Sequence, residues 1–163
     1  MSFDLIQALS GDALAQRQAM SAILSCNQFS SEHGLTLTEE QAAELVETRG
    51  VSLRANGRVE FGGGVIDRLI RAFCSSPYLT AQNYAPTLHE LTEIFYCCKN
   101  ETLDQISDDE LIRFMAQAYN GPCGGSLELL ANRELAELAR RLRFGGAGIK
   151  ADEAGEEGES DES

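Results

Sequence analysis

The sequence contains no long apolar run and no basic segment ahead of an apolar stretch near its N-terminus. No run within its 163 residues approaches the roughly 18 apolar residues that cross a bilayer. The first residues, Met1–Ile6, carry no base, which is unlike a secretory signal. We therefore expect a cytoplasmic protein that does not bind membranes.

Paired cysteines are also missing. The five cysteines are an odd number at irregular spacings, and no two of them form the Cys-x-x-Cys pair that structural zinc sites use. Together with the missing export signal, this pattern predicts free thiols, with neither a disulfide framework nor a metal site. The five residues are Cys26, Cys74, Cys97, Cys98 and Cys123.

The adjacent Cys97 and Cys98 point about 100° apart if their segment is helical. Cys98 then shares an arc with Phe95, which predicts a small core residue. Cys97 falls between Glu90 and Glu93, whose negative charges raise a thiol pKa. Neither thiol is expected to act as a nucleophile.

A nucleophile motif of the Gly-x-Ser-x-Gly type is absent as well. The two histidines do not replace it. His33 precedes Gly34 at an expected helix end, and His89 lies away from the apolar arc of its predicted helix, as a surface or interface residue. Without an assembled catalytic set we lean against an enzyme and expect no cofactor.

Positive charge is scarce. The formal net charge is -13, from 26 acids against 13 bases. A chain this acidic is repelled by a phosphate backbone, so we expect no nucleic-acid partner. Residues 151–163 hold seven of the acids and no base, and from Gly145 onward the composition is mainly Gly, Ser and acid. We predict a helical domain over residues 1–144 and a disordered acidic tail over 145–163.

What the sequence does contain is helical periodicity. Capping boxes at Thr38–Gln41 and Ser107–Glu110 predict two helix starts. Pro86 suits the first turn of another helix. Together these signals predict an all-α fold, a compact bundle of about six helices with at most a short extended segment near 58–61. The predicted helices span residues 12–27, 39–53, 65–75, 86–99, 108–119 and 126–144.

The last predicted helix carries a narrow apolar stripe with spacings of four, four, three and four residues. A stripe of this width is suited to packing against one neighbouring helix. Its members are Leu127, Ala131, Leu135, Leu138 and Leu142.

A glycine-rich segment raises the question of a phosphate-binding loop. Residues 58–64 read Arg-Val-Glu-Phe-Gly-Gly-Gly and lead directly into a predicted helix. A Walker loop needs a Lys and a Ser or Thr after its last glycine, but Asp67 and Arg68 follow here. The dinucleotide pattern fails too, because Asp67 stands where the third glycine belongs. The segment is therefore not a nucleotide-binding signature.

Local charge still favours an anion at this place. Between Arg49 and Arg71 there are five arginines against two acids, in an otherwise acidic chain. Three glycines at a helix N-terminus leave backbone N–H groups accessible to an anion. The candidate ligand-binding residues are Gly62, Gly63, Gly64, Arg58, Arg68 and Arg71. The alternative is a sharp turn into a helix with no ligand.

Five segments, taken together, resemble an uncharacterised protein family of clostridial and related Firmicutes bacteria. The resemblance covers roughly residues 35–140, and its motifs are packing and turn signals. It implies a bacterial cytosolic protein and carries over no functional residue. The segments are 58–64 (RVEFGGG), 83–88 (NYAPTL), 95–101 (FYCCKNE), 107–112 (SDDELI) and 124–129 (GGSLEL).

Amphipathic helices without a catalytic set favour a non-enzymatic protein-interaction or regulatory module. Its expected partner is another protein or a second copy of the chain. The alternative is a binder of a small anionic ligand at Gly62–Gly64, with the nearby arginines.

Overall fold

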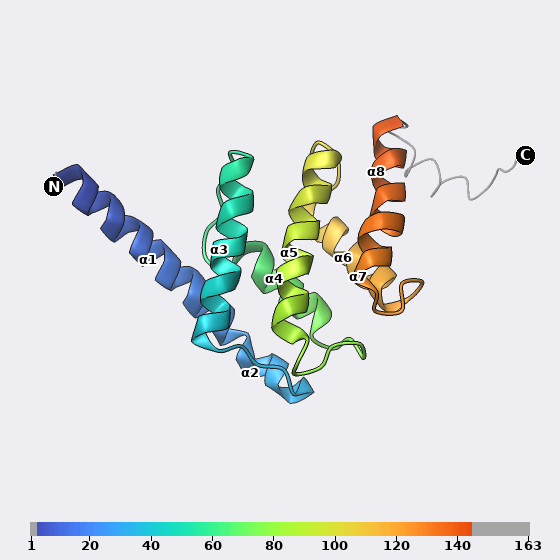
Figure 1. Ribbon diagram of the computed structural model, residues 1–163, viewed down its shortest axis with the longest axis horizontal. Helices are drawn as coiled ribbons and strands as arrows, with labels where there is room; N and C mark the ends of the chain where they lie inside the picture. The colour runs from blue at the N-terminus through green and yellow to red at the C-terminus, as the bar shows by residue number, and fades with distance from the viewer. Residues whose placement is uncertain (1–2, 145–163) are drawn as a thin grey trace, which may run out of the picture. The chain divides into compact units, whose positions relative to one another are not determined.

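The computed structural model describes the backbone of residues 3–144 and the side chains of residues 13–144, so the predicted acidic tail lies outside the described residues. Over this range the protein is all-α, as predicted, and residues 58–61 form no strand (Figure 1). The first elements are α1 (Phe3–Ser25), α2 (Asn27–Ser30), η1 (Ser31–His33), α3 (Glu39–Ala55) and α4 (Gly64–Phe73). The others are α5 (Tyr84–Glu101), α6 (Asp108–Asn120), α7 (Leu127–Leu129), η2 (Leu130–Glu134) and α8 (Leu135–Phe144).

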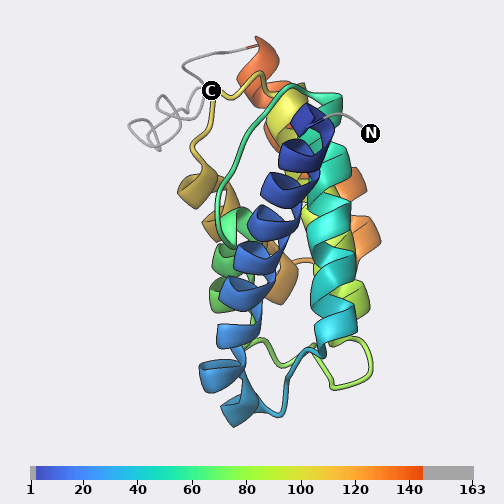
Figure 2. The same ribbon diagram turned by 90° about the vertical axis from the view of Figure 1, so that its left-hand side faces the viewer.

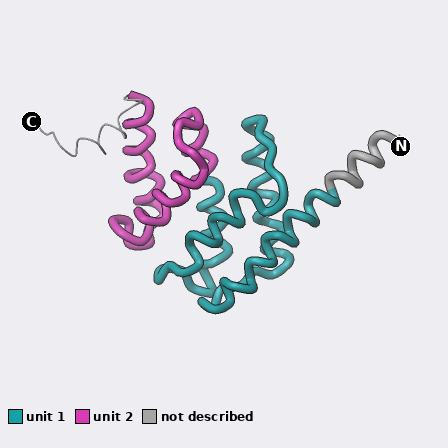
Figure 3. Tube along the Cα trace, turned by 180° about the vertical axis from the view of Figure 1, so that it is seen from behind, with its two compact units in different colours: residues 1–94 teal, residues 95–163 magenta. Residues whose placement is uncertain are grey.

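The chain divides into two compact units, residues 1–94 and 95–163, and the boundary falls inside α5 (Figure 3). In the first unit α1 lies beside α3 and also contacts α4 (Figure 2). In the second unit α6 packs against η2. The single domain expected over residues 1–144 stays a prediction.

Both predicted capping boxes are confirmed. At the start of α3, Gln41 N donates to Thr38 Oγ1 (3.1 Å), and Thr38 N donates to Gln41 Oε1 (2.9 Å). Ser107 and Glu110 make the same reciprocal pair at the start of α6. Each box satisfies two backbone donors that a helix start otherwise leaves without partners.

The apolar face of α4 is buried as its periodicity predicts. Five side chains spaced three or four residues apart all lie in the core. They are Val65, Ile66, Leu69, Ile70 and Phe73. Pro86 is the third residue of α5, inside the first turn, where its missing N–H leaves no hydrogen bond unmade.

The first helix differs from its predicted bounds of 12–27. It begins at Phe3 and continues through Gly11, because one internal glycine costs a helix only about 1 kcal/mol. It ends at Ser25, and the short helices α2 and η1 follow up to the left-handed Gly34. Cys26 is buried at this junction.

The last predicted helix contains a π-helical turn that periodicity alone does not reveal. Residues 127–144 stay helical throughout, but η2 has π geometry. A π-turn inserts one residue, so Leu130 and Leu135, five apart, are both buried. Leu127 and Ala131 of the predicted stripe are only half-buried. The stripe is therefore correct from Leu135 onward and out of register before it.

Candidate functional site

The segment between α3 and α4 has an inverted polarity. Val59 and Phe61 are 74% and 85% exposed, whereas the alternating Arg58 and Glu60 are half-buried. Water-facing segments usually show the opposite arrangement, with polar side chains outward. We call residues 58–64, which end at the first residue of α4, the α3–α4 loop. Its apolar side chains face solvent and its charged ones face the protein.

Glu60 occupies the position where the sequence suggested an external anion. Its Oε1 accepts a hydrogen bond from the backbone N–H of Val65 (3.3 Å), in the first turn of α4. Gly63 is the N-cap of this helix and has no side chain to fill that role. Because a helix N-terminus favours negative charge, the Glu60 carboxylate stabilises α4 from within the chain.

Arg49 attaches the α3–α4 loop to α3. It is only 6% exposed, its Nη1 donates to the Gly62 carbonyl (2.9 Å), and the same nitrogen lies 3.7 Å from Glu60 Oε1. The Arg49 Nε is buried with no hydrogen-bond partner. The cation, the carboxylate and the carbonyl therefore form one cluster beneath the loop.

Two of the three glycines adopt backbone conformations that favour glycine, and the third is closely packed. Gly62 and Gly64 have φ of 59° and 53°, a region that favours glycine. A side chain at position 64 would collide with Glu60 Oε1 and Arg49 Nη1. A Cβ at Gly63 would lie 3.0 Å from the Asp67 Cβ.

The three predicted arginines have different environments. Arg71 Nε donates to Asp67 Oδ1 (2.7 Å), and its guanidinium carbon lies 4.8 Å from the centre of the Phe29 ring. Arg68 is exposed and Arg58 half-buried. Asp67 thus neutralises Arg71, as a surface ion pair whose energy is small.

Arg49 and Glu60 were not among the predicted site residues, although both lay in the segment considered. The sequence contains one signal that identifies Arg49 as a buried charged residue. It follows Leu45 by four residues and precedes Leu53 by four, so it lies on the apolar face of α3. A charged residue at such a position requires a partner, because an unpaired buried charge is strongly destabilising.

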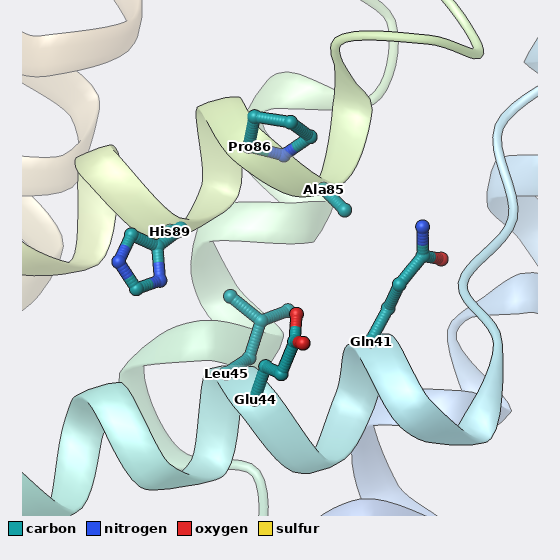
Figure 4. A pocket seen from close by; sticks show the side chains of 6 residues that line it. All are labelled: Gln41, Glu44, Leu45, Ala85, Pro86 and His89. Atoms are coloured by element: carbon teal, nitrogen blue, oxygen red, sulfur yellow. The ribbon is translucent and has the colours of Figure 1, made fainter.

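A pocket of about 310 Å³ lies between α3 and α5, within the first unit (Figure 4). Leu45, Ala85 and Pro86 form its apolar wall. The side chains of Gln41 and Glu44 rise from α3 toward α5 (Figure 4). We call this the α3–α5 pocket. Its lining residues are Gln41, Glu44, Leu45, Ala85, Pro86 and His89.

His89 stands at one end of the α3–α5 pocket, in a fixed orientation. Its Nδ1 lies 2.7 Å from Thr48 Oγ1, which donates its single proton to the Glu44 carbonyl (3.0 Å). The shared hydrogen bond therefore needs the proton on Nδ1. Nε2 lies 3.8 Å from Glu93. The side chain is 46% exposed, in agreement with a surface position.

All five cysteines are free, and Cys98 is a core residue as predicted. The exposed Cys97 has a raised pKa, first because of partial burial and then because of Glu101, rather than Glu90 or Glu93. Within the described side chains, no group of three His, Cys, Asp or Glu residues is placed to hold a metal ion. No described helix has the length and apolarity of a membrane span.

Comparison with known proteins gives one match. Residues 22–148 match the sequence model of a family of unknown function, DUF6323. Neither the curated proteins nor the solved structures contain a match to the chain. The matched region includes the α3–α4 loop and the α3–α5 pocket.

Proposed function

Given that the chain belongs to DUF6323, a family of unknown function, we propose that it is a non-enzymatic protein-interaction module whose contact surface is the α3–α4 loop. One observation carries the proposal. Val59 and Phe61, 74% and 85% exposed, project from a loop whose charged residues face inward. Burying an exposed phenylalanine contributes roughly 1.5–3 kcal/mol, enough to make Phe61 the main anchor of a contact.

The attachment of the loop supports this role. Arg49 binds the Gly62 carbonyl, and Glu60 binds the first turn of α4, on either side of Phe61. A loop held in this way loses less conformational entropy when a partner binds. Phe61 is therefore presented in advance of binding.

The positive charge near the loop indicates the chemistry of the partner surface. Of the five arginines from Arg49 to Arg71, Arg49 is buried and Arg71 is paired with Asp67, and Arg68 is exposed on α4 just after the loop. Arg54 is exposed in the last turn of α3, just before the loop. A surface that combines apolar groups with acidic ones is complementary to this region.

The test compares Phe61→Asp with Phe144→Asp. Phe144 is 80% exposed and lies in the second unit, so the same substitution there is a matched control. Immobilised wild type and both variants are incubated with a lysate of the native host. Each captured protein is then purified, and its affinity is measured by calorimetry. We expect Phe61→Asp to weaken binding at least about tenfold, equivalent to about 1.4 kcal/mol, and Phe144→Asp to leave it unchanged.

Equal affinity for wild type and Phe61→Asp would contradict the proposal. So would a wild-type chain that neither self-associates nor captures a partner.

A second candidate function is the binding of a small anion at Gly62–Gly64, with Arg58, Arg68 or Arg71 nearby. The observation that favours it is the buried Arg49 Nε without a partner, beside a helix N-terminus that already attracts the Glu60 carboxylate. An external anion binds here only by displacing that carboxylate. Phosphate or a phosphorylated metabolite is the matching ligand class.

Glu60→Gln tests this second function, with Glu93→Gln as a control of equal charge change. The amide lacks the charge that competes with phosphate, so inorganic phosphate should raise the melting temperature of Glu60→Gln more than that of wild type or Glu93→Gln. The same comparison extends to a panel of phosphorylated metabolites. A flat response from wild type and Glu60→Gln alike would exclude the anion site.

A further inference from the structure

We infer that the α3–α5 pocket receives Phe61 from a second copy of this chain. The inference rests on the proposed function, because it uses the same exposed loop and names its occupant. The projecting group and the receiving pocket both lie in the first unit, and both are described.

Size and surface chemistry fit a phenyl ring. A cavity of roughly 150 Å³ is sufficient to bind benzene, and the α3–α5 pocket measures about 310 Å³. Leu45, Ala85 and Pro86 offer apolar contact. The His89 imidazole, held by Thr48, supplies a fixed aromatic group at one end. Aromatic pairs of this kind add to the energy of burial alone.

The charges on the two surfaces are opposite. The stretches of α3 and α5 that line the pocket, residues 39–47 and 84–94, contain no Lys or Arg. Glu44, which lines the pocket, makes no ion pair within the described part of the chain. The α3–α4 loop carries Arg58 and follows Arg54. The acids in the two stretches are Glu39, Glu40, Glu44, Glu47, Glu90 and Glu93, of which Glu47 pairs with Arg54 of the same molecule.

A molecule does not fill its own pocket with Phe61. The side chain is 85% exposed, and the adjacent Gly62 carbonyl is bound to Arg49. Arg49 follows Thr48, the residue that contacts His89, and one residue is about 100° around a helix. The loop is thus attached about 100° around α3 from the Thr48–His89 end of the pocket. Only another copy can bring Phe61 into it.

The resulting contact joins two different surfaces and is therefore head-to-tail. Such contacts form closed rings, or open chains when the rotation between copies does not close. One inserted side chain with a few flanking charges makes a small interface, of the size found in weak and transient complexes. Association should therefore depend strongly on protein concentration and weaken with added salt.

The experiment uses two variants of the full chain that remove opposite halves of the contact. Phe61→Asp removes the inserted side chain and keeps the pocket. Glu44→Arg keeps Phe61 but places a positive charge where Arg54 and Arg58 of the other copy must approach. Phe144→Asp and Glu128→Arg are the matched controls, since Glu128 is exposed in the second unit and lies outside both acidic stretches. Average mass is measured by sedimentation velocity over a range of concentrations.

We expect wild type and both controls to self-associate, with each test variant at least tenfold weaker. A mixture of the two test variants gives a more specific test than either variant alone. Phe61→Asp retains an intact pocket and Glu44→Arg an intact loop, so equal amounts should form a one-to-one dimer that grows no further.

Three results would overturn the inference: a wild type that stays monomeric at every concentration, a Glu44→Arg variant that associates like wild type, or a mixture with no dimer. None of these touches the proposed function, which stands or fails on the affinity of Phe61→Asp for a different partner. If Phe61→Asp self-associates as wild type does, the inference fails, and the proposed function is still decided by the affinity of Phe61→Asp for a captured partner.

Discussion

At the scale of single residues, Lys99 organises the turn after α5. It is 5% exposed, and its Nζ donates to the Ile106 carbonyl (2.7 Å) and lies 2.8 Å from Asp108 Oδ1. The turn contains Leu103 and Asp104 in the left-handed region, with φ of 53° and 61°. The left-handed conformation is unfavourable for residues other than glycine, so contacts elsewhere in the turn must stabilise it. The hydrogen bonds of Lys99 supply them.

We predict that Lys99→Met lowers the free energy of unfolding by about 2–3 kcal/mol. Methionine keeps the apolar stem but removes the donor to the buried Ile106 carbonyl and the partner of Asp108. Urea denaturation followed by circular dichroism measures the change. Arg54→Met is the control: its pair with Glu47 is 70% exposed on both sides, so the loss should stay below about 0.5 kcal/mol. Equal losses for the two variants would refute the role given to Lys99.

At the scale of elements, the π-turn η2 sets the register of the last helix. Leu130 and Leu135 are both buried although they are five positions apart, because a π-turn holds one more residue than an α-turn. Beyond it, Leu138 and Leu142 continue the buried face with ordinary α-helical spacing.

Deleting Asn132 tests this register. The residue is exposed within η2, and its removal leaves Leu130 and Leu135 four apart, which suits an α-helix. We expect the free energy of unfolding to change by less than about 1 kcal/mol. Deleting the exposed Ala136 instead turns Leu138 and Leu142 about 100° away from the core.

That second deletion should cost more than about 3 kcal/mol, because two buried leucines lose their contacts. The two deletion variants are compared by urea denaturation under identical conditions. If removal of Asn132 is as damaging as removal of Ala136, η2 is not the site of an inserted residue.

At the scale of the whole molecule, two buried thiols and one buried phenol, which ionise at high pH, make the stability depend on pH. Burial, followed by the Asp67 carboxylate, raises the pKa of Cys26 from 9.0 to about 12. Burial, followed by Glu101, raises the pKa of Cys98 to about 12. Burial raises the pKa of Tyr84 from 10.0 to about 12, although the Ser30 hydroxyl acts in the opposite direction. All three groups favour the protonated form in the folded state.

The direction of the effect follows from these values. Above about pH 9 the unfolded thiols release protons that the folded protein retains, so the unfolded state gains stability as pH rises. We predict that the contribution of these groups to the free energy of unfolding is constant at neutral pH and falls between pH 9 and pH 12. Each thiol contributes at most about 1.4 kcal/mol per pH unit.

Cys98→Ala should make that fall less steep, because it removes one of the coupled groups. Ile23→Val is the control, since it removes a methylene from a fully buried side chain and should lower stability equally at every pH. Urea denaturation at successive pH values gives both slopes. An unchanged slope in Cys98→Ala would show that this thiol does not carry the effect.

The sequence by itself determined the helices and most of their buried faces. Thr38 and Ser107 begin α3 and α6 through contacts with residues only three positions away, and such local chemistry can be recognised in a one-dimensional pattern. The apolar spacing of α4 likewise states which face is buried. The failure of Gly62–Gly64 to match a nucleotide-binding motif was also visible, because it depends only on residue types.

Only the tertiary structure decided what the loop and the pocket are. Arg49 meets the Gly62 carbonyl across 13 positions, and Thr48 meets His89 across 41. These contacts exist because packing brings α3 against the start of α4 and against α5, and no local pattern encodes such distances. The same packing turned Glu60 inward and left Phe61 exposed. A segment whose composition suggested anion binding thereby became a fixed loop that presents an aromatic side chain to solvent.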